Sequence, residues 1–171
     1  MAKPVGPRCN LACSYCYYLE TEGMYGGARP PTMSLGLLET YIRQYIEASL
    51  GPVVAFTWHG GEPTLAGLAF FEQVVALQAR HRPDGVTIHN TLQTNSVSLD
   101  DAWCRFFKAH AFLVGVSLDG PQALHDVYRV DKAGRPTFER VRHGLQLLDR
   151  HGVETNILTT LHAANAPHPL E

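Results

Sequence analysis

Residues 53–63 read Val53-Val54-Ala55-Phe56-Thr57-Trp58-His59-Gly60-Gly61-Glu62-Pro63, an apolar run that ends in a polar loop rich in glycine. A run of this kind predicts a strand buried on both faces, as strands of parallel sheets are. Neighbouring parallel strands need a crossover connection, which is usually a helix. The stretch therefore predicts an α/β fold in which helices flank the strand along the chain.

Helical patterns do lie on both sides of this strand. Ser34 is a good N-cap for a helix that runs to about Leu50, with its apolar residues on one face. The second helix is expected over residues 68–81, which carry a broad apolar face. The next helices are expected from residue 99 or 100, over 121–129 and over 138–151, and the next strands over 86–94, 112–118 and 154–161.

The two ends of the chain and one connection are less regular. Residues 1–5 are a short apolar start that fits the end of a strand, and residues 20–32, rich in glycine and proline, predict an irregular connection. Residues 169–171 resemble a first helical turn. The sequence as a whole thus alternates strand and helix, which predicts right-handed parallel units.

Polar residues gather where the predicted strands end. They are His59 to Pro63, then Gln93-Thr94-Asn95, then Ser117-Leu118-Asp119. Ligands of parallel α/β folds bind at the carboxyl ends of the strands. We therefore expect these groups to meet at one rim of the sheet.

Composition bounds the class of protein. The chain has 171 residues, 45% of them hydrophobic, which is ordinary for one soluble globular domain. Fourteen basic and sixteen acidic residues give a formal charge of -2, so no broad attraction to nucleic acid or to a membrane is expected. No charged-then-apolar leader or membrane-spanning run is evident, which predicts a cytoplasmic protein with free thiols.

Three of the four cysteines stand close together in Cys9-Asn10-Leu11-Ala12-Cys13-Ser14-Tyr15-Cys16. Three thiolates can hold three corners of a cubane iron-sulfur cluster and leave one iron open to a small molecule. A structural zinc site usually takes four ligands in two separated pairs, and cysteines this close rarely reach disulfide geometry. Cys104, on a predicted helix, fits a small buried hydrophobe.

These motifs resemble a known family. The triplet Cys9, Cys13 and Cys16, followed after the next strand by Gly60-Gly61-Glu62-Pro63, resembles the radical S-adenosylmethionine (radical SAM) enzymes. More narrowly, four stretches are similar to the anaerobic sulfatase-maturating enzymes: Cys13-Ser14-Tyr15-Cys16-Tyr17-Tyr18-Leu19, Trp58 to Gly67, Leu92-Gln93-Thr94-Asn95, and Val114-Gly115-Val116-Ser117-Leu118-Asp119-Gly120. The resemblance covers nearly the whole chain.

The resemblance implies a partial (β/α) barrel of the radical SAM type, with about four and a half of the family's six strand-helix units. Residues 1–171 would then form the N-terminal part of the core domain, without the rest of the barrel and without the C-terminal domain of auxiliary clusters. The family's catalytic aspartate belongs to the part that is missing. No residue of this chain is therefore assigned the role of catalytic base.

The resemblance also implies the chemistry. The cofactors would be a [4Fe-4S] cluster, held by Cys9, Cys13 and Cys16, and S-adenosylmethionine, which binds the open iron and yields a 5′-deoxyadenosyl radical. That radical would convert a cysteine or serine of a sulfatase polypeptide to formylglycine. A reducing donor such as flavodoxin or ferredoxin would supply the electron.

The loop at residues 60–63 is expected at the cofactor. Gly60 and Gly61 would let the backbone approach the methionyl amino group, while Glu62 and Pro63 shape the loop. The alternative is an ordinary turn between a strand and a helix.

Four further residues are expected to contact the cofactor. Ser117 would bond the ribose or carboxylate, and Arg129 would pair with the carboxylate, although a surface charge is its alternative. Gln93 would contact cofactor or substrate, and Tyr15 would lie along the adenine, with a packed core tyrosine as its alternative.

The substrate side is assigned to Tyr18, which could instead pack in the core, and to His59. Asp119 and Asn156 are further polar groups expected to line the barrel. Ser96 stands where the family commonly has glycine after Gln-Thr-Asn, which affects the local turn. Two alternative functions remain open: another peptide-modifying radical SAM enzyme, or a non-catalytic protein that binds a cluster or zinc.

Overall fold

A computed structural model describes residues 1–25 and 32–169. Its centre is a parallel sheet of four strands in the order β1 (Val53–Trp58), β2 (Thr87–Thr94), β3 (Leu113–Ser117) and β4 (Thr155–Leu158). Each strand pairs with the next one along the chain, so that Gln93 lies beside Gly115 and Gly115 beside Asn156. The predicted α/β class and parallel topology are confirmed.

Four helices connect and cover the strands: α2 (Leu35–Ala48), α3 (Leu68–His81), α4 (Asp101–Ala109) and α6 (Phe138–Arg150). Two begin at the side-chain caps expected of such residues. Ser34 Oγ accepts from Leu37 N at 3.3 Å, and Asp100 Oδ1 accepts from Trp103 N at 3.0 Å. The helices pack on the sheet in one core that includes Leu38, Ile42, Phe56, Trp58, Phe71, Val74, Phe107, Val114, Val141 and Leu148.

The helices cover one face of the sheet only, within the described residues. In β1, Val54, Phe56 and Trp58 are buried, whereas Val53 and Ala55 are exposed. The prediction that this strand is buried on both faces is therefore wrong. Its apolar run reflects a packed face against α2 and α3, and the opposite face of the sheet carries the residues of a cavity described below.

The N-terminal segment joins the same sheet by a single bridge. Ala2 N donates to Thr57 O at 2.8 Å and His59 N donates to Ala2 O at 2.9 Å, beside the end of β1. The first predicted strand is thus reduced to one bridged residue. Residues 170–171 of the predicted C-terminal helical turn lie outside the described residues.

The short helix α1 (Tyr18–Gly23) lies where an irregular connection was predicted from residue 20, so that prediction was wrong there. The turn of the cysteine segment starts the helix, since Cys16 N donates to Cys13 O and Leu19 N donates to Cys16 O. The glycines that suggested an irregular segment begin only at the last residue of the helix.

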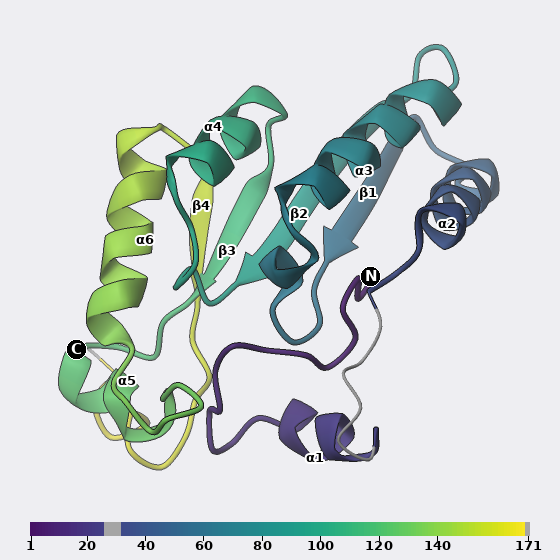
Figure 1. The fold of residues 1–171 in the computed structure, drawn as a ribbon. Coiled ribbons are helices and arrows are strands. Elements are labelled where there is room, and N and C mark those ends of the chain that lie inside the picture. Colours follow the sequence, from purple (N-terminus) through teal and green to yellow (C-terminus); the bar gives the residue numbers. More distant parts are fainter. Residues whose placement is uncertain (26–31, 170–171) are drawn as a thin grey trace.

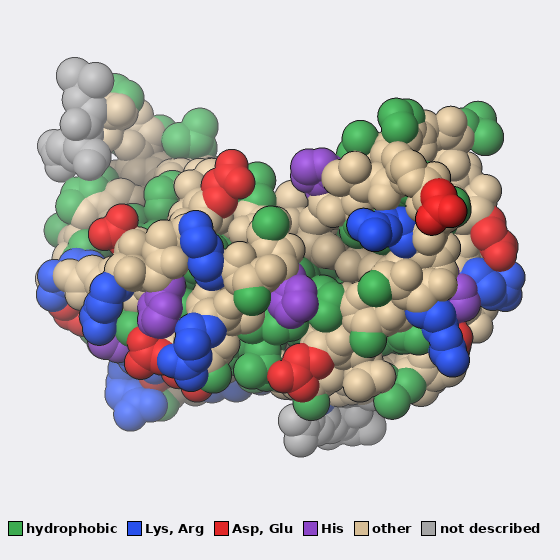
Figure 2. Space-filling view, turned by 90° about the horizontal axis from the view of Figure 1, so that it is seen from above, with side chains coloured by type: hydrophobic (Ala, Val, Ile, Leu, Met, Phe, Trp, Pro, Cys, Tyr) green, Lys and Arg blue, Asp and Glu red, His purple; other side chains and the backbone are tan. Residues whose placement is uncertain are grey.

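Two more short elements complete the molecule, the 3₁₀ helix η1 (Pro63–Ala66) and α5 (Gln122–Tyr128). The strands point toward the end of the molecule where α1, α5 and the N-terminal segment lie (Figure 1). The opposite end shows acidic, basic and histidine side chains interspersed (Figure 2). Among the described residues, no helix has the length and apolar character needed to cross a membrane.

Candidate cofactor site

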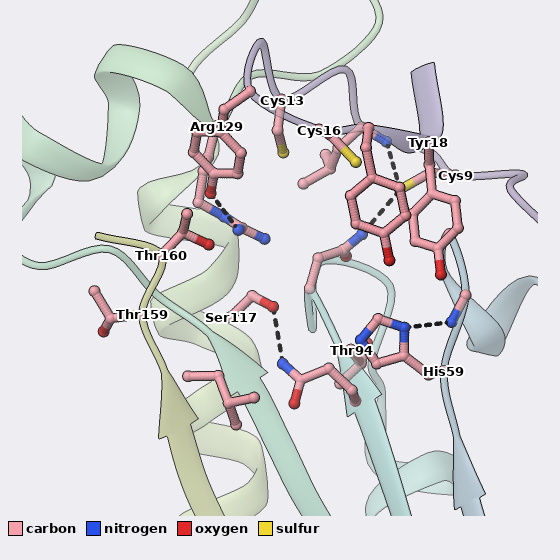
Figure 3. Close-up of a pocket in the computed structure, with 18 residues that line it drawn as sticks. Cys9, Cys13, Cys16, Tyr18, His59, Thr94, Ser117, Arg129, Thr159 and Thr160 are labelled. Carbon is pink, nitrogen blue, oxygen red and sulfur yellow. Dashed lines mark hydrogen bonds between the residues drawn. The ribbon is translucent and has the colours of Figure 1, made fainter. Parts of the chain in front are cut away.

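A cavity of about 390 Å³ lies at the carboxyl ends of the strands, between the sheet and the cysteine segment (Figure 3). Each strand lines the cavity either with its own last residues or with those of the loop that follows it. Its lining includes Cys9, Cys13, Tyr15, Cys16, Tyr18, His59, Gly60, Gly61, Gln93, Thr94, Asn95, Ser117, Arg129, Thr159 and Thr160. The structure therefore brings together most of the site residues predicted from sequence, at one rim as expected.

The three cysteines of the N-terminal segment line one wall of this cavity. All of them are free thiols. Burial, reinforced by the carboxyl group of Glu62, raises the pKa of the Cys9 thiol to about 12. Burial also raises the pKa of Cys13, against the opposing effect of Arg129. Within the described part of the chain, no three His, Cys, Asp or Glu side chains form a group that could hold a single metal ion.

Backbone hydrogen bonds hold the cysteine segment against the end of α5 and the loop that follows it. Ala12 N donates to Val130 O at 2.9 Å, and Ser14 N donates to Tyr128 O at 3.0 Å. Leu11, which is buried, forms an antiparallel bridge with Asp131. The cysteines are thus carried on a backbone that is anchored along its length.

The loop after β1 holds the residues that lead into the cysteine segment. Gly61 N donates to Gly6 O and Glu62 N donates to Arg8 O, each at 2.9 Å. A Cβ on Gly61 would lie 2.1 Å from Arg8 O, and one on Gly60, whose φ is +118°, would lie 2.7 Å from Gly6 O. Two glycines are required here because two backbones cross in contact.

Glu62 and Pro63 do not line the cavity. Glu62 instead stabilises the loop that carries Gly60 and Gly61. The Glu62 carboxylate is fully buried and accepts four hydrogen bonds, from Thr64 N, Thr64 Oγ1, Thr94 Oγ1 and Asn95 N. Burial raises the pKa of this carboxyl, and the four donors act in the opposite direction. The carboxylate therefore ties the loop after β1 to the end of β2.

A buried polar network surrounds Tyr15. The Tyr15 hydroxyl donates to Asp119 Oδ2 and accepts from Arg129 Nη1 at 2.8 Å. Asp119 is fully buried, its Oδ1 accepts from Thr160 N at 3.0 Å, and its Oδ2 lies 3.9 Å from Arg129 Nη1. The ring of His162 stacks on Tyr15 with ring centroids 5.8 Å apart. Burial raises the pKa of Tyr15 to about 12.

Arg129 is buried rather than a surface charge, which removes the alternative considered from sequence. Its guanidinium lines the cavity, and its buried Nε has no hydrogen-bond partner in the described structure. A buried donor without a partner is costly. This nitrogen is therefore a candidate for a ligand contact.

Gln93 and Ser117 lie on adjacent strands and face the cavity together. Gln93 Nε2 donates to Ser117 Oγ at 2.9 Å. Gly115 makes room for this pair, since a Cβ there would lie 2.1 Å from Gln93 Oε1 and 3.0 Å from Asn156 Oδ1. Asn156 belongs to the same row of the sheet but does not line the cavity.

Tyr18 and His59 form the wall of the cavity opposite Arg129 (Figure 3). Tyr18 is buried, its ring centroid lies 4.3 Å from that of Tyr17, and Lys3 Nζ lies 5.1 Å from the centre of its ring. His59 Nδ1 accepts from Gly60 N at 2.6 Å, which leaves the proton of the neutral ring on Nε2. Burial and the charge of Lys3 lower the pKa of His59, and thus favour that neutral form.

Several cavity residues were not singled out from the sequence. Thr94 and Asn95 belong to the polar end of the predicted strand, of which the resemblance assigns a role only to Gln93. Thr159 and Thr160 were included in a predicted strand, whereas β4 ends at Leu158. Their position directly after a shorter strand is the signal that could have found them.

The comparisons with known proteins agree with this geometry. The model of the radical SAM superfamily matches residues 4–166. The serine-type anaerobic sulfatase-maturating enzyme of Bacteroides thetaiotaomicron is 47% identical over 171 residues, which are all of this chain and 41% of that protein. The cysteine-type enzyme of Clostridium perfringens is 36% identical over 98% of this chain and 45% of its own length.

A solved structure shares the fold. Native anSMEcpe with bound AdoMet superposes with a TM-score of 0.90 at 37% identity, over 97% of this chain and 45% of that chain. The chain thus spans less than half the length of these relatives. The family match extends over nearly all of its residues, and the chain belongs to the radical SAM superfamily.

Proposed function

We propose that this chain is the N-terminal, cofactor-binding part of the radical SAM core of a sulfatase-maturating enzyme, which oxidises a serine or cysteine of a sulfatase to formylglycine. The observation that carries the proposal is the shared cavity. Three cysteines line it together with Gly60, Gly61, Ser117 and Arg129. Membership of the superfamily implies a [4Fe-4S] cluster and S-adenosylmethionine as cofactors.

The donor set fits such a cluster. Thiolates are the ligands of [4Fe-4S] clusters, and Cys9, Cys13 and Cys16 offer three of them on one wall of the cavity. A cluster contains several metal atoms, so its ligands need not converge on one point as the ligands of a single ion must. Three ligands leave one iron for S-adenosylmethionine. With an electron from a donor such as flavodoxin or ferredoxin, the bound cofactors supply a 5′-deoxyadenosyl radical.

The residues of the chain would then bind and orient the cofactor. Arg129, with its unpaired buried Nε, would hold the carboxylate by charge-assisted hydrogen bonds. Ser117 and Gln93 present a hydroxyl and an amide for the ribose or carboxylate. Tyr15, which Arg129 holds at its hydroxyl, would lie along the adenine. Gly60 and Gly61 would offer backbone to the methionyl amino group.

The substrate would enter on the side of Tyr18 and His59, which form the wall opposite Arg129 (Figure 3). The hydroxyl of Tyr18 and the Nε2 proton of His59, both at the cavity, would be donors for a peptide. Serine is favoured as the target residue, because identity to the serine-type relative exceeds identity to the cysteine-type relative. Four free cysteines suit a reducing compartment, and we infer a cytoplasmic setting.

Anaerobic reconstitution with iron and sulfide tests cofactor binding. The chain should take up about four irons and four sulfides, and it should cleave S-adenosylmethionine reductively to methionine and 5′-deoxyadenosine. Cys13→Ala should lose both properties. Cys104→Ala is the matched control, since Cys104 is buried among the helices away from the cavity, and it should keep them. Zinc without iron after anaerobic expression would contradict the proposal.

A sulfatase-derived peptide tests the reaction. The protein that contains this chain should remove two hydrogens from the target serine, which mass spectrometry detects as conversion to the aldehyde. A matched peptide with alanine at the target position is the control. Cleavage of S-adenosylmethionine without any change in the serine or cysteine peptide would favour another peptide-modifying enzyme.

A further inference from the structure

The sulfur of Cys9 differs from those of the other two cysteines in its hydrogen bonds. Cys9 Sγ accepts from Leu11 N at 3.4 Å and lies 3.7 Å from the side-chain nitrogen of Asn95. Over residues 1–25 and 32–169, no side-chain donor makes a hydrogen bond to the sulfur of Cys13 or Cys16, and the backbone donor at the Cys13 sulfur is the N–H of Cys13 itself. One corner of the cysteine triplet is thus distinguished by its surroundings.

The orientation of the Asn95 amide is determined by its partners. Its Oδ1 accepts from Val97 N at 3.1 Å, so its Nδ2 must face the opposite way. There the two protons of Nδ2 meet two acceptors, Asn10 Oδ1 at 2.8 Å and Cys9 Sγ. Asn10 in turn donates to Ser98 Oγ at 3.0 Å. A flipped amide would place a carbonyl against the sulfur and a donor against Val97 N.

The position of Asn95 is also held. Its side chain is buried at the cavity, and its backbone N–H donates to Glu62 Oε2 at 2.8 Å. Glu62 belongs to the loop after β1, whose neighbour Gly61 binds Gly6 just before the cysteine segment. The donor and the sulfur therefore sit on segments that are tied to the same loop.

We propose that Asn95 is a positioning residue that donates to the Cys9 thiolate, and that it thereby raises the reduction potential of the cluster bound there. This inference rests on the proposed function, because it requires the three cysteines to carry the cluster. Reduction adds negative charge to the cluster and its sulfur ligands, so an N–H donor stabilises the reduced form more than the oxidised form. Removal of the donor makes reduction harder.

Spectroscopy of the anaerobically reconstituted chain tests the contact directly. Asparagine labelled with nitrogen-15 should give a magnetic coupling to the reduced cluster in pulsed electron paramagnetic resonance. Asn95→Ala should lose a coupling that Ser98→Ala retains. Ser98→Ala is the matched control because it removes a hydrogen-bond partner of Asn10 and leaves the contact between Asn95 and the Cys9 sulfur in place.

A redox titration followed by the same resonance tests the consequence. Asn95→Ala should shift the potential to more negative values, and Asn95→Asp should shift it further, since a carboxylate keeps the contact with Val97 N but faces the sulfur with negative charge. Ser98→Ala should titrate like the unaltered chain. Iron and sulfide content is measured for each protein, so that a shift is read only from loaded protein.

Two outcomes overturn the inference in distinguishable ways. If the unaltered chain takes up no four-iron cluster, the proposed function fails and the inference fails with it. If the unaltered chain is loaded but shows no coupling that depends on Asn95, or if Asn95→Ala and Asn95→Asp leave the potential unchanged, the inference alone is refuted.

Discussion

Glu62 accepts a hydrogen bond from the backbone N–H of Asn95 at 2.8 Å, and this contact joins the loop after β1 to the end of β2. The same carboxylate accepts from the hydroxyls of Thr64 and Thr94 and is fully buried. Because the backbone N–H of Glu62 also donates to Arg8 O at 2.9 Å, this one residue joins three segments at the rim of the sheet.

Glu62→Gln should therefore destabilise the fold although it hardly changes the shape of the side chain. The amide offers one carbonyl oxygen where the carboxylate offered two, and its NH₂ group meets other donors. An unsatisfied buried group costs about 1–3 kcal/mol. The free energy of unfolding in urea should therefore fall by about 1 kcal/mol or more. Glu72→Gln, on the exposed face of α3, should stay within about 0.5 kcal/mol of the unaltered chain. Equal effects of the two changes would contradict this reading.

Gly61→Ala should prevent folding or cost several kcal/mol, since its Cβ would lie 2.1 Å from a backbone oxygen that cannot move without opening the crossing. Gly36→Ala is the matched control. A Cβ at this position in α2 meets nothing within 4 Å, and alanine is favoured over glycine in helices by about 1 kcal/mol. Circular dichroism and thermal melting compare the two. A Gly61→Ala protein that melts like the unaltered chain would show that the crossing can relax.

Regular elements could be predicted because their signals are local. The apolar face of residues 68–81 gives α3 with the same bounds, and Val53–Trp58 gives β1. Burial was harder to predict, because the run at residues 53–58 does not tell which of its faces a helix covers. The helix α1 was missed because its start depends on the turn of the cysteine segment rather than on apolar periodicity.

In the candidate site, too, local motifs could be predicted from the sequence and contacts between distant segments could not. Motifs at strand ends pointed to the cysteines, Gln93 and Ser117, the family resemblance pointed to Arg129, and all of these line the cavity. The contacts between segments could not be predicted. Asp119 meets Thr160 because β3 and β4 pair in one register, and it meets Tyr15 because the cysteine segment is hydrogen-bonded to residues 128 and 130. The left-handed φ of +57° at Ser96 agrees with the glycine that relatives were expected to have there.

Tyr15→Phe should destabilise the fold more than the loss of an ordinary tyrosine hydroxyl. Without this hydroxyl, the buried carboxylate of Asp119 and guanidinium of Arg129 face each other at 3.9 Å with a partner missing on each. Hydrogen bonds to charged groups contribute about 1.5–3 kcal/mol each, so urea unfolding should show a loss of at least that size. Tyr45→Phe, which removes a partly exposed hydroxyl on α2, is the control and should cost less. Similar losses would indicate that water replaces the Tyr15 hydroxyl.

His125 makes the stability of the fold depend on pH. The ring is fully buried: its Nδ1 accepts from Asp119 N at 3.3 Å, so the proton of the neutral ring lies on Nε2, which is 3.0 Å from Thr137 Oγ1. Burial and the charge of Arg129 lower the pKa of His125 from 6.5 to about 4, and the nearby carboxylates of Asp119 and Asp126 only partly oppose them.

His125 is therefore protonated below about pH 6.5 in the unfolded chain, but only below about pH 4 in the folded chain. Stability is retained above pH 6.5 and falls as the pH decreases toward 4, by about 3 kcal/mol from this residue. His125→Asn keeps an acceptor for Asp119 N but cannot titrate, so its free energy of unfolding in urea should fall less over this range. His89→Asn, at an exposed position on β2, should leave the full loss in place. If His125→Asn and the unaltered chain lose the same stability between pH 6.5 and 4, the ring is not kept neutral by its surroundings.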